Sequence, residues 1–261
     1  DPEVGESLVH LYRRLTSEDV RYVGKVEVAE ATKVIENVQR DINIALVNEL
    51  AQIFPELDLD VEDVLSAAAT KWNFHRYTPG IGVGGHCIPV DPYYMMQRAQ
   101  EVGVPAELIT AARAVNRMMP RHVAGVIREL MYQSGVPAGE GRVLFLGWSY
   151  KAGVGDARET PTEPLAQNLI ESSISVSTWD PYLSAEDIPD GIGIVDDIEA
   201  ANGFDMVVLA TAHPECMEID WGALHARMRT PILYDGRRVL NLGEMQEMGW
   251  MANAVGSPPR Y

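Results

Sequence analysis

Cysteine is nearly absent from this sequence, since Cys87 and Cys216 are its only two thiols. Two cysteines cannot build the disulfide framework of a small secreted domain, so a reducing cytoplasm is the expected location. Long apolar runs are missing as well, and no stretch reaches transmembrane length. No signal peptide is visible, although the first residue is Asp1 rather than Met.

Positive charge is also scarce. The chain has 21 Lys and Arg against 38 Asp and Glu, which gives a net charge of −17. This balance argues against nucleic acids and anionic membranes as partners. It also makes each basic residue informative, because lysine occurs only at Lys25, Lys33, Lys71 and Lys151. The 46% hydrophobic content nevertheless supports globular cores, and 261 residues are enough for two domains.

Residues 78–94 form the most unusual stretch, TPGIGVGGHCIPVDPYY, with four glycines, three prolines and Cys87. Glycines at this density let the backbone adopt positive φ angles and pass close to a ligand. Asp91 is expected to cap a following helix, with Pro92 as its first residue. A thiol in a glycine-lined loop beside a helix N-terminus is the setting in which cysteine becomes a nucleophile.

The same stretch contains Gly80-x-Gly82-x-x-Gly85, which matches the dinucleotide-binding pattern. That pattern has meaning only between a buried strand and a helix within a βαβ unit. Tyr77-Thr78-Pro79 precedes it and a proline follows soon after, so we reject this interpretation.

The first 136 residues are predicted to be helical. Apolar residues at three- and four-residue spacing predict helices over 2–15, 25–54, 61–70, 92–102 and 105–134. Asp60 is expected to cap the third, and Pro120 should kink or divide the last. A helix as long as 25–54 favours packing against a partner, although a core helix of one subunit is the alternative. It carries Lys33 and Asn37 on one face.

From residue 142 strands alternate with helices. Strands are predicted over 143–146, 174–179, 206–210 and 232–234, and Thr160 to Glu163 match a capping box. This alternation predicts a Rossmann-like, doubly wound parallel sheet with helices on both faces. Ligands of such sheets bind at the carboxyl ends of strands, where Lys151, Asp180 and Arg237 follow. The tail after Met251 is expected to be loose.

Residues 82–94, GVGGHCIPVDPYY, closely resemble the active-site signature of the UDP-glucose/GDP-mannose dehydrogenase family, the NAD-dependent nucleotide-sugar 6-dehydrogenases. Residues 29–37 resemble its second signature, Ala-Glu-x-x-Lys followed by Asn. The segment 70–74 and the Gly-His-Cys triplet look most like the branch that acts on UDP-N-acetylhexosamines. Val90 agrees, because UDP-glucose members usually carry Lys there.

The resemblance implies a mechanism in which Cys87 is the nucleophile. Its thiolate holds the aldehyde intermediate, and the resulting thioester is hydrolysed by water. Lys33 and Asn37 are then expected to stabilise the oxygen at C6, and Asp91 to position or activate water. NAD is the implied hydride acceptor.

The resemblance also implies binding residues. Tyr77, Gly84, Lys151 and Arg237 match elements that contact the UDP-sugar, and Arg158 matches an arginine that reaches toward the cofactor cleft. No spacing of ligand residues predicts a metal.

The implied organisation is a remnant of an NAD-binding domain over 1–20, a helical central and dimerisation domain over 21–136, and a Rossmann-like UDP-sugar-binding domain over 137–261. The chain thus looks like a fragment of an enzyme of roughly 400 residues that is inactive without its NAD domain. The implied product is a uronic acid for polysaccharide synthesis, made by a homodimer that pairs through the helix over 25–54.

Other interpretations stay open. A non-catalytic nucleotide-sugar-binding and dimerisation module would not need Cys87, and a thiol hydrolase would not need Lys151 or Arg237. A UDP-glucose or GDP-mannose 6-dehydrogenase is a third possibility. Because side chains of adjacent residues in an extended loop point apart, His86 is not expected to act with Cys87 as a peptidase pair. Arg238 is expected to form a surface salt bridge.

Overall fold

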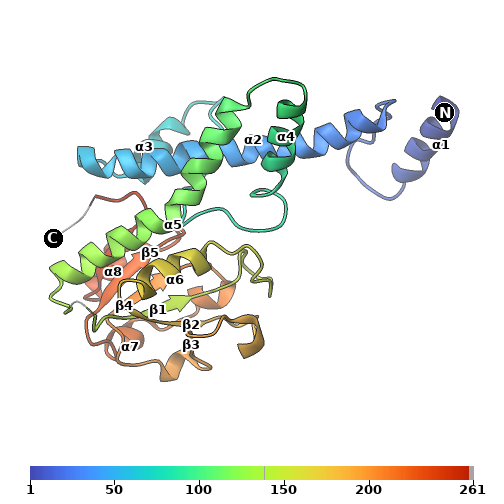
Figure 1. Ribbon diagram of the computed structural model, residues 1–261. Coiled ribbons are helices and arrows are strands. Elements are labelled where there is room, and N and C mark those ends of the chain that lie inside the picture. Colours follow the sequence, from blue (N-terminus) through green and yellow to red (C-terminus); the bar gives the residue numbers. More distant parts are fainter. Residues whose placement is uncertain (138, 259–261) are drawn as a thin grey trace.

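The chain folds into a helical layer and an α/β layer (Figure 1). This computed structural model describes residues 1–137 and 139–258. The helical layer contains α1 (Pro2–Tyr12), α2 (Val26–Ile53), α3 (Val61–Ala68), α4 (Asp91–Glu101) and α5 (Glu107–Gln133). No helix in the described ranges combines the length and apolar content needed to cross a membrane.

Helices α2 and α5 form the framework of the helical layer. On α2, Val38, Ala45 and Ala51 are buried at helical spacing, and α5 packs along that face. Pro120 lies inside α5, which is one helix over its whole length. Figure 1 shows a bend about midway along α5, so the proline kinks the helix rather than divides it.

The N-terminus of α3 agrees with the sequence prediction, and that of α4 does not. Asp60 caps α3 as predicted, with Oδ1 accepting from the Glu62 amide at 2.8 Å. Asp91, in contrast, is the first residue of α4, and Val90 occupies the cap position without a side-chain hydrogen bond. The prediction for Asp91 was wrong because its carboxylate accepts a hydrogen bond from Asn37 on α2 instead.

The predicted capping box at Thr160 is also absent. Helix α6 (Thr162–Ile170) has Pro161 at its cap position and no side-chain cap. The Thr160 hydroxyl instead donates to the Trp148 carbonyl at 2.7 Å. Its oxygen also accepts from the Thr162 amide at 3.3 Å, so one local bond at the start of the helix remains but the reciprocal bond of a capping box is missing.

The α/β layer is built on one sheet of six parallel strands in the order β3-β2-β1-β4-β5-β6. The strands are β1 (Arg142–Leu146), β2 (Ser175–Trp179), β3 (Gly193–Ile194), β4 (Met206–Leu209), β5 (Ile232–Asp235) and β6 (Met251–Ala254). This is the Rossmann strand order, and its switch point lies between β1 and β4. The prediction of a doubly wound parallel sheet is confirmed.

Two of the strands were not predicted. The expected loose tail after Met251 is wrong for residues 252–258, since β6 pairs in parallel with β5, with Met251 opposite Ile232. The rest of that expectation, over residues 259–261, lies outside the described residues. Its residues, Met-Ala-Asn-Ala, have low strand propensity. The strand forms because the edge of β5 offers unpaired backbone groups, which no local pattern in the tail reveals.

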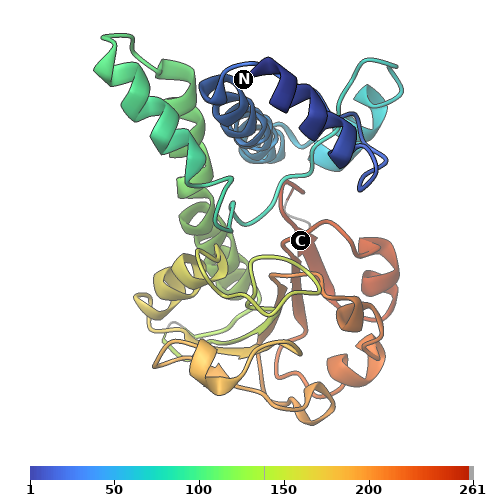
Figure 2. The same cartoon turned by 90° about the vertical axis from the view of Figure 1, so that its right-hand side faces the viewer.

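Each face of the sheet is covered by its own apolar cluster. Alternating residues of β1 point to opposite faces. Val143 and Phe145 pack with residues of α5 and α6, whereas Leu144 and Leu146 pack with a cluster that includes residues of α7 (Trp221–His225) and α8 (Leu242–Glu247). The first cluster also contains residues of α2 and α3, so the two layers share a core. Figure 2 shows them stacked.

A buried ion pair also joins the layers. Arg238 Nη2 lies 2.6 Å from Asp60 Oδ1, and Arg238 Nε donates to the Val255 carbonyl. The two side chains are only 7% and 10% exposed. The expectation of a surface salt bridge was wrong, because β6 and the start of α3 enclose this arginine.

Replacing Arg238 by Met is expected to lower the free energy of unfolding by about 3–5 kcal/mol, since the Asp60 carboxylate would lose its partner while remaining buried. Urea denaturation measures this change. The matched control is Arg98→Met, which breaks an exposed ion pair with Glu101 and should cost at most about 1 kcal/mol. Equal effects of the two variants would contradict the analysis.

Candidate functional site

The glycine-rich loop runs between the two layers. No strand precedes Gly80 within residues 69–90, so it lacks the context of a dinucleotide-binding turn. Its first glycine is fixed by α2, because the Gly80 amide donates to Asn48 Oδ1 at 3.0 Å.

Asn48 is held in turn by a buried polar chain between α2 and α5. Its Nδ2 donates to Asn116 Oδ1 at 2.9 Å, and Asn116 Nδ2 donates to the Asp41 carboxylate at 2.8 Å. Arg113 is ion-paired with the same carboxylate, whose pKa is raised because burial outweighs the attraction of the guanidinium. Asn116 Nδ2 also donates to the Asp41 backbone carbonyl, which can only accept, so each amide in the chain has one orientation and Asn48 presents its oxygen to the loop.

Farther along, the loop lies directly on the α/β layer. A Cβ atom at Gly84 would lie 2.7 Å from the Glu159 carbonyl oxygen and 2.9 Å from Tyr150 Cβ. Gly85 has a φ of +94°, and a Cβ there would lie 2.7 Å from the Tyr150 ring. Only glycine allows an approach this close, so the loop needs these residues.

Cys87, two residues after Gly85, is exposed and lies just before the start of α4. The Asp91 amide donates to the Cys87 carbonyl at 2.8 Å, and Asn37 Nδ2 donates to Asp91 Oδ2 at 2.6 Å. Asn37 is buried on α2. The structure therefore brings together three residues that the sequence analysis selected, from two helices and the loop. Cys216, in contrast, is buried, and desolvation raises the pKa of its thiol to about 12.

Lys33 lies one helical turn before Asn37 but is not engaged with this group. Its side chain is 66% exposed and its ammonium lies 3.8 Å from Glu36. In the described residues it forms no ion pair with Asp91 within 4.0 Å. Lys33 thus lies on the same helix as Asn37, but its ammonium is paired with Glu36 rather than with Asp91.

A cavity of about 300 Å³ adjoins the loop at the carboxyl ends of the strands. Gly84, Lys151 and Arg237 line it, together with Tyr150 and Ile44 of α2. Ile88, the residue after Cys87, also lines it, whereas Cys87 itself does not, so the cavity adjoins the loop that carries the thiol. Three residues predicted to bind substrate therefore share one cavity.

Two predicted residues lie elsewhere. Tyr77 is half-buried against the shared apolar core and does not line this cavity. Arg158 is 74% exposed, and its guanidinium donates twice to Asp156.

Arg237 is the cation most clearly fixed at this cavity. Its Nε donates to the Ala210 carbonyl, while its Nη2 is buried without a hydrogen-bond partner. Burial lowers the pKa of Arg237 to about 10, so the side chain stays charged at neutral pH. A buried donor without a partner is costly, and an anion bound beside it would remove that cost.

The sequence analysis missed the role of His213, which lies beside Asp180 at the carboxyl ends of the strands. Asp180 Oδ2 accepts from the amides of Trp148 and Ser149 at 2.7 and 2.9 Å, and His213 Nε2 lies 3.1 Å away. Burial raises the pKa of Asp180, but these hydrogen bonds outweigh it and the net shift is downward. His213 Nδ1 accepts from the Gly153 amide. The pair therefore fixes the loop that carries Lys151, and only the strand order brings its members together.

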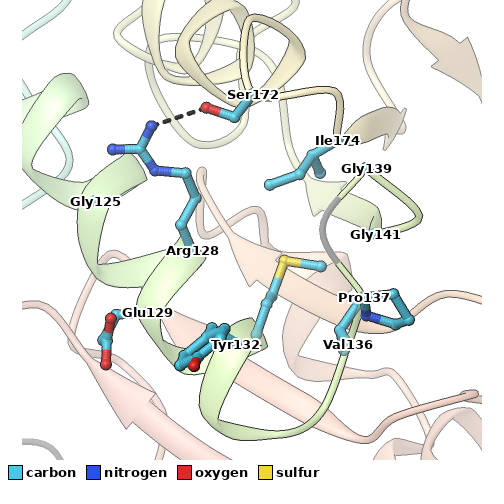
Figure 3. A pocket seen from close by; sticks show the side chains of 11 residues that line it. Gly125, Arg128, Glu129, Tyr132, Val136, Pro137, Gly139, Gly141, Ser172 and Ile174 are labelled. Atoms are coloured by element: carbon cyan, nitrogen blue, oxygen red, sulfur yellow. Dashed lines mark hydrogen bonds between the residues drawn. The ribbon is translucent and has the colours of Figure 1, made fainter.

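A larger hollow, of about 510 Å³, lies at the amino ends of β1 and β2 (Figure 3). It is lined by the C-terminal part of α5 and by residues that precede β1, and Arg128 donates to Ser172 Oγ across it. It contains none of the predicted site residues. In the described ranges, no three His, Cys, Asp or Glu side chains are placed to hold a metal ion. We therefore place the candidate site at the cavity beside Cys87.

Family models match both layers of the chain. Residues 27–118 match the central domain of the UDP-glucose/GDP-mannose dehydrogenase family, and residues 144–242 match its UDP-binding domain. The segment between the two matches contains most of the second half of α5.

Individual relatives agree with these models. The UDP-N-acetyl-D-glucosamine 6-dehydrogenase of Pseudomonas aeruginosa is 42% identical over 215 residues, which are 82% of this chain and 51% of that protein. The UDP-N-acetyl-D-mannosamine dehydrogenase of Pyrococcus horikoshii is 34% identical over 241 residues, or 91% and 55% of the two chains. A solved structure titled as the UDP-D-ManNAc dehydrogenase of that organism superposes with a TM-score of 0.85 at 31% identity, covering 99% of this chain and 58% of that one.

The chain thus spans about half the length of the relatives it matches. Its fold, its two family matches and these relatives lead to one conclusion: the chain belongs to the UDP-glucose/GDP-mannose dehydrogenase family, whose members are oxidoreductases.

Proposed function

We propose that the protein takes part in the NAD-dependent oxidation of the C6 hydroxyl of a UDP-N-acetylhexosamine to a carboxylate, for polysaccharide synthesis. The observation that supports this most is that the loop carrying Cys87, which is hydrogen-bonded through its backbone to Asp91, shares a cavity with Lys151 and Arg237. A cytoplasmic location, which keeps the thiol reduced, is part of the proposal.

The cavity is proposed to hold the nucleotide diphosphate. The chain has a net charge of −17, so binding two phosphates requires local positive charge. Lys151 and Arg237 supply it, and the orphaned Nη2 of Arg237 gains an acceptor when an anion binds. Gly84, which presents bare backbone on the cavity wall, is proposed to admit the sugar, and Tyr77 to support the arm of the loop behind it.

Loss of a hydride and a proton from the C6 hydroxyl gives an aldehyde, to which the Cys87 thiolate is proposed to add, forming a thiohemiacetal. Loss of a second hydride gives a thioester, which water hydrolyses to the acid with release of the thiol. Asn37 anchors Asp91 Oδ2, which leaves the other carboxylate oxygen to orient the attacking water. Lys33 is proposed to exchange Glu36 for the oxygen at C6 and to stabilise its negative charge together with Asn37. The flexible lysine stem permits this exchange.

NAD, when bound, is proposed to supply the oxidising capacity for both steps. The described residues do not form its cradle, because the Trp148 and Ser149 amides after β1 are already hydrogen-bonded to Asp180. In a dinucleotide-binding sheet the corresponding turn holds the pyrophosphate. From this chain we propose only Arg158, which is exposed, as a residue that faces the cofactor.

Replacing Cys87 by Ser in the full-length protein should leave UDP-sugar affinity within about twofold and slow release of the uronic acid by roughly a thousandfold or more, as expected when a nucleophile is removed. Calorimetry and NADH absorbance measure the two quantities. Full NADH production by this variant would remove Cys87 from the mechanism and favour a role limited to binding.

Replacing Lys151 by Ala should weaken UDP binding by roughly tenfold to a hundredfold, because a charged hydrogen bond to phosphate is lost. Calorimetric titration with UDP measures this. Lys25→Ala is the matched control, since Lys25 is also exposed, at the start of α2, and does not line the cavity. An equal loss in both variants would contradict a specific phosphate contact.

We also propose a homodimer that pairs through α2. Val28, Ile35, Leu46 and Ile53 are 45–54% exposed and lie on one side of this helix, at spacings of seven and eleven residues. A stripe of this kind on a helix of 28 residues matches the geometry of a helix–helix interface.

Leu46→Glu should convert the dimer to a monomer at micromolar concentration, because a carboxylate would be buried in an apolar contact. Sedimentation velocity reports the mass of each form. Tyr132→Glu, a change of an exposed residue on α5, should leave the dimer intact. A wild-type chain that sediments as a monomer would refute the pairing.

A further inference from the structure

The loop that carries Cys87 makes a side-chain contact with the α/β layer at His86. His86 Nε2 lies 2.8 Å from Asp156 Oδ2, and its ring meets Tyr150 edge-on with centroids 5.7 Å apart. His86 is therefore held by a polar contact and an aromatic contact, both to residues of the loop that follows β1. No step of the proposed mechanism uses this histidine.

The direction of the polar contact is fixed. Hydrogen bonds from Arg158 and then from His86 lower the pKa of Asp156, so the carboxylate is ionised at neutral pH and can only accept. His86 must then carry a proton on Nε2 and donate it. Arg158 donates from Nε and Nη2 at 2.9 and 2.8 Å, which fixes the plane of the carboxylate.

Asp156 also belongs to the loop that lines the cavity. The Tyr150 amide donates to the Asp156 carbonyl at 3.0 Å, and Tyr150 and Lys151 both line the cavity. Asp156 therefore has two attachments. Its backbone carbonyl binds Tyr150, which is adjacent to Lys151, and its carboxylate binds His86, which is adjacent to Cys87.

We propose that His86 is a positioning residue that couples occupancy of the cavity to the setting of Cys87, through Asp156. The inference rests on the proposed function, since it takes UDP as the occupant. When a diphosphate binds at Lys151 and orders the loop over residues 150–156, the hydrogen bond to His86 transmits that order to the loop carrying the thiol. If His86 only stabilised the fold, replacing it would not change the effect of UDP on the thiol.

The chain offers a direct readout that needs no cofactor. Only two cysteines exist, and Cys216 is buried with a thiol pKa of about 12, so iodoacetamide at pH 8 reports on Cys87. Saturating UDP should slow alkylation of Cys87 in the wild-type chain by at least about threefold. Mass spectrometry of the modified peptide gives the rate and confirms which cysteine reacted.

Two variants separate the hydrogen bond from the packing of the ring. His86→Phe keeps an aromatic ring beside Tyr150 but lacks the donor, and the effect of UDP on the rate should fall to within about 1.3-fold. His86→Gln retains an N–H that reaches Asp156, and at least half of the effect should return. Asp156→Ala tests the other partner and should lose the effect as His86→Phe does, because no acceptor remains for the His86 N–H.

Calorimetry with UDP accompanies each variant and distinguishes the possible failures. If UDP binds His86→Phe with normal affinity and still slows alkylation threefold, UDP shields the thiol directly and the coupling is overturned. An alkylation rate in the wild-type chain that does not respond to bound UDP also overturns it, while leaving the proposed function intact. If UDP does not bind the wild-type chain, both proposals fail.

Discussion

The site depends on a steric constraint: there is no room for a side chain at Gly84. The backbone of the glycine loop lies against the Glu159 carbonyl and Tyr150 at distances that no Cβ atom could share. This contact seats the loop on the α/β layer and makes it one wall of the cavity. Cys87 follows three residues later, so the position of the thiol depends on how closely that backbone approaches.

Hydrogen bonds with fixed directions hold the same loop from both layers. On the helical side, the chain from Asp41 through Asn116 to Asn48 orients an acceptor toward Gly80. On the α/β side, Asp156 accepts from His86. Both arrangements begin at a carboxylate that is also bound to an arginine. A carboxylate anchored in this way cannot reverse its role, so the loop is fixed in orientation as well as in place.

Much of this architecture could be predicted from sequence, because the signals were local. Helical spacing located α2, the cap at Asp60 located α3, and four apolar segments located four strands. The failures share a cause. At Asp91 the side chain expected to cap a helix bonds to a distant partner, Thr160 donates to Trp148 without completing a capping box, and β6 exists only because β5 lies beside it. Interactions between distant segments replaced local ones, and spacing along the chain does not encode them.

The candidate site divides in the same way. Cys87, Asn37 and Asp91 were selected by resemblance to a family signature, and hydrogen bonds connect them. The contacts of His86 with Asp156 and of His213 with Asp180 join residues 70 and 33 positions apart, which only the folded chain reveals. The catalytic and binding roles of all the selected residues, Lys33, Tyr77 and Arg158 among them, and the domain boundary at residue 136 stay predictions.

Helix α5 contributes to both layers. Its Asn116 completes the polar chain with α2, while Met119, Val123 and Ile127 are buried in the core that covers one face of the sheet. If a chimera took the chain from β1 onward from another family member, its sheet would pack against an α5 from a different protein. A crossover before this helix, in the turn after α4, would instead part Asn116 from Asp41 and Asn48 on α2, so neither boundary leaves α5 with both sets of native partners.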